Sequence, residues 1–270
     1  MKLKIKHFSR SVFEKKLQHL NHLDFSLFVE DVPQNQEDLS DINIIAFQEP
    51  NEYFGLHDWV IQNKDLFSAI LTWDDKVLNT CPNALLLPFG HTWLKPDQYE
   101  KEHTKEFKLA HLQGKLLKKY GHSLRHETSN RKDELTIPTK FYETYGDRNN
   151  IEDARVGKEF IFSDSQFGVV IENVSHRNYF SEKILDCFLL KTIPVYWGCS
   201  NIRDYFDTNG IITISNVDDL IQVCNNLTED FYESKKESIE RNWNKAKQFV
   251  DYEQNIVDIV TQIFKQNNLI

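Results

Sequence analysis

The segment ENVSHRNYFSEKILDCFLLKTIPVYWGCS, residues 172–200, links two apolar runs that predict neighbouring strands. One run precedes it at residues 167–171, the other lies within it at residues 192–197, and an amphipathic helix is expected between them. This order of strand, polar loop, helix and strand describes a βαβ unit of a parallel sheet. Ser181 suits the N-cap of the helix and Lys183 falls in its first turn. Because anions bind where parallel strands end and helices begin, the segment predicts a site for a phosphorylated ligand.

The same alternation of strands and helices continues on both sides of this segment. Further strands are expected within the alternating N-terminus, MKLKIKHFSR, and at residues 25–29, 42–47, 67–72, 83–87 and 211–214, and two more apolar segments lie at residues 107–112 and 160–162. Residues 229–266 indicate a long helical region, with an interruption near residues 250–253. Residues 97–105 are charged and lack apolar periodicity, so they are the expected linker. We therefore expect an α/β protein with one domain over residues 1–103 and another over residues 104–270.

Composition narrows the class of protein further. The chain has 270 residues, of which 40% are hydrophobic and 27% are charged, as is typical of a soluble globular protein. Its net charge of -9 argues against a general nucleic-acid binder, although a local basic cleft for a small anion remains compatible with it. The N-terminus lacks the apolar core of a signal peptide, and no window is apolar over the length of a membrane span.

The cysteines and histidines do not form a recognisable metal site. The four cysteines include no CxxC pair, and free thiols would fit a reducing compartment. Cys187 and Cys224 fall on apolar helical faces and are expected to be buried, while a disulfide between Cys187 and Cys199 stays open. The spacings of four histidines in the middle of the chain match no common zinc site; these are His103, His111, His122 and His126.

Residues 167–206 closely resemble the signature of the α-1,3/1,4-fucosyltransferases, glycosyltransferase family 10. That family carries an F-x-x-x-x-E-N segment, then Y-x-[TS]-E-K, then a run that ends in P-V-x-W-G. The matching positions are Phe167, Glu172-Asn173, Tyr179-Phe180-Ser181-Glu182-Lys183 and Pro194-Val195-Tyr196-Trp197-Gly198. Upstream, GHSLRHE at residues 121–127 and FQEPNEYF at residues 47–54 resemble the family's phosphate-binding and acceptor-side segments more loosely. The shared order and spacing make the resemblance specific.

The resemblance implies two Rossmann-like domains that face each other across a cleft, which is the GT-B arrangement. It also implies an inverting transfer of L-fucose from GDP-fucose to a hydroxyl of an oligosaccharide or glycoconjugate, with an α-1,3 type of linkage. Such enzymes do not generally need a bound metal, so no cofactor is expected beyond the donor, and any divalent ion would be non-essential. Without a membrane anchor, a cytoplasmic enzyme of bacterial or viral type is expected, with its oligomeric state open. A transferase of another GDP-sugar and a catalytically silent nucleotide- or carbohydrate-binding protein are the alternatives.

Five residues are implied to bind the donor by their match to the family. Lys183 and Arg125 would hold the diphosphate, while Asn173, Tyr179 and Glu182 would line the nucleotide-sugar pocket. Negative charge builds up on the leaving diphosphate, and without a metal it must be stabilised by fixed cations. Arginine supplies two parallel hydrogen bonds and lysine a point charge. Each residue also has a plainer role open to it: Glu182 would complement the helix dipole, and Tyr179 would pack in the core.

The two cations have structural alternatives as well. Lys183 would be a solvated lysine on a helix, as most lysines are. Arg125 would form a surface ion pair with Glu127 or Glu134. The position of Lys183 at a helix start beside a parallel strand favours phosphate binding.

Glu49 is implied to be the general base that takes the proton of the acceptor hydroxyl. It follows the apolar strand expected at residues 42–47 and precedes Pro50, so its surroundings can raise its pKa. Glu52, Asp74 and Asp75 are rival bases that the sequence leaves open. Aromatic residues that either face a carbohydrate acceptor or fill the core gather in the first part of the chain; they are Tyr53, Phe54, Trp59, Trp73 and Trp93.

Overall fold

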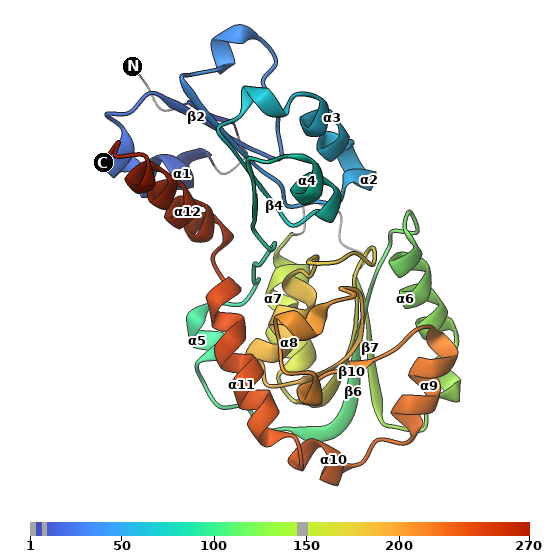
Figure 1. The fold of residues 1–270 in the computed structure, drawn as a ribbon. Coiled ribbons are helices and arrows are strands. Elements are labelled where there is room, and N and C mark those ends of the chain that lie inside the picture. The colour runs from blue at the N-terminus through green and yellow to red at the C-terminus, as the bar shows by residue number, and fades with distance from the viewer. Residues whose placement is uncertain (1–3, 7–9, 145–150) are drawn as a thin grey trace. The chain divides into compact units, whose positions relative to one another are not determined.

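The computed structural model describes residues 4–6, 10–144 and 151–270, which form two compact units with one parallel sheet each (Figure 1). The first unit comprises Met1–Phe89, Arg177–Tyr179 and Asp251–Ile270, and the second comprises Gly90–His176 and Phe180–Val250. These limits differ from the expected division at residue 103. The expected linker instead contains a helical turn, and the C-terminal helix belongs to the first unit.

The first unit is a five-stranded parallel sheet of order β1-β2-β3-β4-β5. Its strands are β1 (Lys4–Lys6), β2 (Phe25–Val29), β3 (Ile42–Ala46), β4 (Ala69–Thr72) and β5 (Ala84–Leu86). Its helices are α1 (Arg10–Lys16), α2 (Asn51–Phe54), α3 (Leu56–Gln62), α4 (Asp75–Thr80) and α12 (Tyr252–Gln266). Every residue of β2 is buried, as expected for a strand covered by helices on both faces.

The two faces of this sheet hold separate apolar cores. On one face, α1 and α12 lie side by side and pack Phe13, Leu17 and Val260 against residues such as Leu27 and Ile44 (Figure 1). On the other face, α3 and α4 pack against alternate residues of the same strands. The apolar stripe of α12 therefore completes the first unit, and this is why the helix does not belong to the second.

The second unit is a five-stranded parallel sheet of order β10-β9-β8-β6-β7. Its strands are β6 (Glu106–Gly114), β7 (Thr139–Thr144), β8 (Ser165–Ile171), β9 (Ile193–Trp197) and β10 (Ile212–Thr213). Its helices are α5 (Pro96–Tyr99), α6 (Tyr120–Asn130), α7 (Ile151–Phe162), α8 (Glu182–Leu189), α9 (Val217–Asn225), α10 (Glu229–Glu233) and α11 (Lys236–Ala246). β7 lies on one side of β6 in the sheet, and β8, the next strand along the chain, lies on the other side of β6. The sheet therefore has a topological switch point between β6 and β8, where ligands of such folds bind.

The apolar segment at residues 160–162 belongs to a helix. These residues end α7, with Ile161 and Phe162 buried and Phe160 exposed. A three-residue apolar run has no periodicity that separates a strand from a buried helical turn. The polar stretch expected to be irregular over residues 139–159 holds β7 and most of α7, and its residues 145–150 lie outside the described part of the chain.

The cysteines agree with their expected character. All four cysteines are buried free thiols, so Cys187 and Cys199 form no disulfide, and burial raises the pKa of the Cys187 thiol to about 12. Of the helices in residues 4–6, 10–144 and 151–270, none combines the length and apolar composition that a bilayer crossing requires.

Candidate functional site

The start of α8 is fastened to the end of β8 by a buried carboxylate. Glu172, which directly follows β8, accepts the backbone N–H of Ser181 at 2.9 Å and its hydroxyl at 2.6 Å. The Ser181 hydroxyl in turn accepts the backbone N–H of Lys183, which makes Ser181 the N-cap that the sequence predicts. A Cβ atom on Gly198 would collide with the Glu172 side chain, so the end of β9 needs glycine there. The first turn of α8 is therefore held rigidly beside the strand ends.

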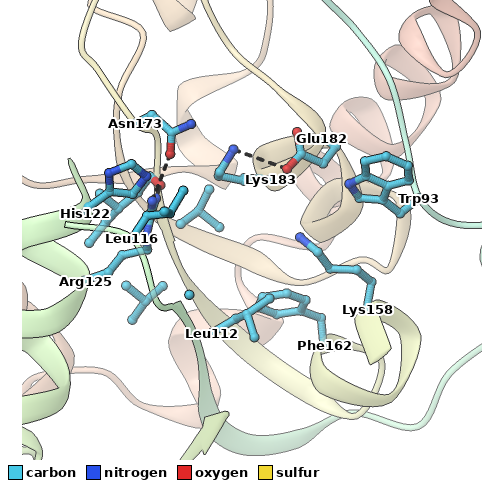
Figure 2. A pocket seen from close by; sticks show the side chains of 14 residues that line it. Trp93, Leu112, Leu116, His122, Arg125, Lys158, Phe162, Asn173, Glu182 and Lys183 are labelled. Atoms are coloured by element: carbon cyan, nitrogen blue, oxygen red, sulfur yellow. Dashed lines mark hydrogen bonds and ion pairs between the residues drawn. The ribbon is translucent and has the colours of Figure 1, made fainter. Parts of the chain in front are cut away.

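A cavity of about 350 Å3 opens in the second unit where β6 and β8 end, at the topological switch point (Figure 2). Four of the five predicted donor-binding residues line it: Arg125, Asn173, Glu182 and Lys183. The remaining lining residues are Trp93, Leu112, Gly114, Leu116, His122, Lys158, Phe162, Val169, Val170 and Ile171. The cavity thus combines apolar walls with a few charged groups, which is typical of a small-ligand site.

Lys183 is a cation held between two carboxylates. Its Nζ atom lies 3.2 Å from Glu182, 3.5 Å from Glu172 and 2.9 Å from the Ser181 hydroxyl. Burial favours the neutral amine, but the charges of the two glutamates outweigh it and raise the pKa of Lys183. The lysine is therefore charged at neutral pH and fixed in place before any ligand arrives.

Glu182 is correspondingly ionised. Burial opposes its charge, but Lys183 and Lys158 outweigh burial and lower the pKa of Glu182 to about 2. In Figure 2 the Glu182 carboxylate faces Lys183 across the cavity wall. A permanently charged carboxylate can accept hydrogen bonds from hydroxyl groups of a bound sugar or ribose.

Arg125 reaches from α6 to the end of β8. Its guanidinium donates to the carbonyl oxygen of Ile171 and, at 2.8 Å, to the side-chain oxygen of Asn173 (Figure 2). The surface pairs considered for it are instead made by Arg131, which binds Glu127 and Glu134. Arg125 therefore places a second cation on the cavity wall.

His122 stands beside Arg125 as an uncharged ring. Burial, together with the charges of Arg125 and Lys183, lowers the pKa of His122 to about 4. Its Nδ1 atom accepts the backbone N–H of Lys119 at 3.0 Å, which fixes the proton on Nε2. Among the described residues no group of three or more histidine, cysteine or acidic side chains is arranged to hold a metal ion.

Tyr179 does not line this cavity. Its ring is buried in the first unit, with its centroid 4.7 Å from that of Trp73. This is the core-packing role that the sequence left open for it. The reason is the loop before α8, because residues 177–179 leave the second unit and pack with the first.

Two of the lining residues that the sequence-based prediction missed contact the same buried carboxylate. Trp93, grouped above with first-part aromatics, belongs to the second unit, and its backbone N–H donates to the buried Asp186 carboxylate at 3.3 Å. Lys158 of α7 lies 3.5 Å from the same carboxylate, on the opposite side of Lys183 from Arg125 (Figure 2). Burial raises the pKa of Asp186 to about 6 against the charge of Lys158. The sequence pattern predicts no helix over residues 139–159, and so it does not indicate that Lys158 faces a cavity.

The predicted base and its rivals all lie in the first unit, at or after the ends of its strands. Glu49 follows β3 and is half-buried, while Glu52 is exposed in α2. Asp74 accepts the backbone N–H of Val77 as the N-cap of α4 and lies 3.2 Å from His57. Asp75 pairs with Arg177 at 2.8 Å.

Comparison with known proteins relates this fold to that of glycosyltransferases. No protein-family model matches the chain. A segment of 57 residues, 21% of this chain, is 30% identical to the α-(1,3)-fucosyltransferase FucT of Helicobacter pylori, and it spans 12% of that protein. A crystal structure of an α1,3-fucosyltransferase matches 96% of this chain and 90% of its own, with a TM-score of 0.57 at 14% identity.

Two further solved structures show the same architecture. An α1,3-fucosyltransferase with GDP-fucose covers 95% of this chain and 90% of its own, with a TM-score of 0.54 at 15% identity. HepE of Anabaena, in complex with UDP-glucose, covers 95% of this chain and 84% of its own, with a TM-score of 0.55 at 10% identity. The chain has a GT-B fold and resembles the α-1,3-fucosyltransferases. The GT-B fold that the resemblance of residues 167–206 implies is thereby confirmed.

Within this fucosyltransferase-like fold, Gly121 is a residue that the sequence did not single out. Its N–H donates to the carbonyl oxygen of Asn173 at 3.2 Å, and a Cβ atom at this position would collide with the carbonyl group of Glu172. The start of α6 therefore approaches the end of β8 more closely than any other residue type allows. This contact sets the distance from which Arg125 reaches the cavity.

Gly121→Ala is expected to push the start of α6 away from β8 and to displace Arg125. We expect GDP binding, measured by calorimetry, to weaken by about tenfold, and unfolding to occur at lower temperature, because steric overlap costs about 1–3 kcal/mol. Gly157→Ala is the matched control, since the nearest atom to a Cβ there lies at an ordinary 3.5 Å. Equal GDP affinity in both variants would contradict this account of Gly121.

Proposed function

We propose that this protein is a glycosyltransferase that transfers L-fucose from GDP-fucose to a hydroxyl of a glycan acceptor, with inversion at the transferred carbon. The observation that carries the proposal is the pair of cations, Arg125 and Lys183, on the wall of a cavity at the switch point of the second sheet. The complex of a structural neighbour with GDP-fucose supports this choice of donor.

In the proposed reaction the second unit binds the donor. Arg125 and Lys183 bind the diphosphate, the Glu182 carboxylate accepts hydrogen bonds from hydroxyl groups of the nucleotide sugar, and the Asn173 side chain forms a hydrogen bond with it. As the bond between the sugar carbon and the diphosphate breaks, negative charge grows on GDP, and both cations are already in place to stabilise it. Glu182 and Glu172 hold the Lys183 ammonium group in place, so that it need not move as the reaction proceeds.

The acceptor hydroxyl must lose a proton as its oxygen bonds to the sugar carbon, on the face opposite GDP. We assign the removal of this proton to the Glu49 carboxylate. The resemblance of residues 47–54 to the family's acceptor-side segment supports this assignment, and the lowered pKa of Asp74 disfavours that rival as a base. No divalent ion takes part in the proposed step, because arginine and lysine supply the positive charge.

The test is a transfer assay of the purified full chain with GDP-fucose and a panel of galactosyl and N-acetylglucosaminyl oligosaccharides. We expect fucosylated product and one GDP for each transfer, with equal rates in the presence and absence of EDTA. GDP-mannose serves as the matched donor control. GDP binding without transfer to any acceptor would favour a binding protein, and transfer from the control donor alone would overturn the choice of sugar. Loss of activity in EDTA would overturn the metal-independent step.

A further inference from the structure

A second glutamate of the first unit holds the backbone of Glu49. Glu30, directly after β2, points its carboxylate at the chain that leaves β3. One oxygen of this carboxylate accepts the backbone N–H of Glu49 at 2.9 Å and also that of Gln48. Both N–H groups lie past the last residue of β3 and no longer belong to the sheet ladder. The Glu30 side chain therefore satisfies donors that the sheet leaves over.

Two more side chains fix the same short segment. The indole N–H of Trp73 donates to the carbonyl oxygen of Gln48 at 3.0 Å, and the hydroxyl of Tyr252 donates to that of Phe47 at 2.9 Å. The three side chains that hold this segment come from different parts of the chain: Glu30 follows β2, Trp73 follows β4, and Tyr252 begins α12. Residues 47–49 are thus held on both their N–H and their C=O sides.

The backbone of Glu30 is itself unusual. Its φ angle is 53°, in the left-handed region that residues other than glycine seldom adopt. Its N–H donates to the carbonyl oxygen of Ala46 at 3.1 Å, which keeps this conformation against β3. Strained residues of this kind gather at functional sites, where the surrounding structure compensates for their cost.

We propose that Glu30 is a positioning residue for Glu49, and that its carboxylate also strengthens Glu49 as the general base. This inference rests on the proposed function, in which Glu49 takes the proton of the acceptor hydroxyl. Hydrogen bonds to the Gln48 and Glu49 N–H groups give the positional part. The position of the Glu30 carboxylate, 2.9 Å from the backbone nitrogen of Glu49, gives the electrostatic part, because an ionised neighbour makes a carboxylate hold a proton more strongly.

The charged groups around Glu30 define the pH range of this effect. Burial and the charge of Glu49 raise the pKa of Glu30 to about 7, against the two backbone N–H groups and His57. His57 lies 3.2 Å from Asp74. Burial and then the charge of Glu30 raise the pKa of the Tyr252 hydroxyl, so that hydroxyl stays neutral. The coupling between the two glutamates is reciprocal, and so Glu49 becomes the stronger base as Glu30 ionises above about pH 7.

Two variants separate position from charge. Glu30→Gln keeps an oxygen that can accept both N–H groups but removes the charge. In the wild type we expect the kcat for fucosyl transfer to rise through a step near about pH 7, and in Glu30→Gln we expect that step to be absent. Glu30→Ala removes the acceptor as well, and its kcat is expected to be about 100-fold lower at every pH. The KM for GDP-fucose should change in neither variant, and exposed Glu37→Gln is the matched control.

The outcomes distinguish this inference from the proposed function beneath it. If Glu49→Gln retains full turnover, the assignment of the base fails. If Glu49 is required but Glu30→Gln keeps the wild-type step, the electrostatic part of this inference is overturned. A folded Glu30→Ala variant with wild-type kcat would overturn the positional part. Should Glu30→Ala unfold, as thermal denaturation would reveal, a lower kcat with unchanged KM in Glu30→Gln at about pH 8 supports the inference and equal values overturn it.

Discussion

Lys183→Ala is expected to weaken GDP binding by about 100-fold and to lower kcat for fucosyl transfer by at least that factor. A buried charge-assisted hydrogen bond contributes about 1.5–3 kcal/mol, and more where charge grows during the reaction. Lys183 stays protonated because Glu182 and Glu172 raise its pKa. The lysine therefore presents a full charge to the diphosphate throughout the ordinary assay range.

Controls must separate this loss from unfolding, because the variant also leaves two buried carboxylates without their cation. The lowered pKa of Glu182 means that its pairing contributes stability above its usual pKa of 4.5, and that this contribution disappears as pH falls toward about 2. Lys183→Ala should therefore unfold at lower temperature at neutral pH, and Lys183→Arg should restore both stability and part of the GDP affinity. Lys236→Ala, a charge change at an exposed site outside the cavity, is the matched control. Unchanged GDP affinity in a folded Lys183→Ala variant would place the phosphate site elsewhere.

The grouping of three predicted residues on one cavity wall could be foreseen because its geometry is local. Asn173, Glu182 and Lys183 lie within one βαβ unit, and a helix start beside a parallel strand brings them together in any such unit. Arg125 was predicted from the resemblance of residues 121–127 to the family. Its hydrogen bonds to Ile171 and Asn173 show how this segment reaches the cavity wall.

The remaining features depend on packing between distant segments, which a sequence pattern does not specify. The amphipathic stripe of α12 shows that one face is buried, but not against which sheet, and the domain limit was therefore placed differently from the observed one. Trp93 and Lys158 enter the cavity wall because Asp186 on α8 binds both. Tyr179 has the residue type of a ligand-stacking ring, yet its loop packs with the first unit.

Glu49→Gln is expected to lower kcat by about 1000-fold, the usual contribution of a general base, while leaving GDP affinity unchanged. The substitution keeps the size of the side chain and its hydrogen-bonding capacity but removes its ability to take a proton. GDP affinity should not change, because the cavity that carries Arg125 and Lys183 lies within the second unit and Glu49 belongs to the first. The measurements are steady-state transfer rates and calorimetric titration with GDP.

The rival bases provide matched controls, because two of them, Asp74 and Asp75, have structural roles. Burial of Asp74 opposes its charge, but His57 and the Val77 N–H outweigh it and lower its pKa, which weakens it as a base. Asp74 is the N-cap of α4, and asparagine caps helices as well as aspartate does. Asp74→Asn is therefore expected to retain both the cap and the turnover. Asp75→Asn should disturb the pair with Arg177 more than the chemistry. Full turnover in Glu49→Gln, with loss in Glu52→Gln, would instead move the base from the strand end to α2, and Glu30 would then have no base to position.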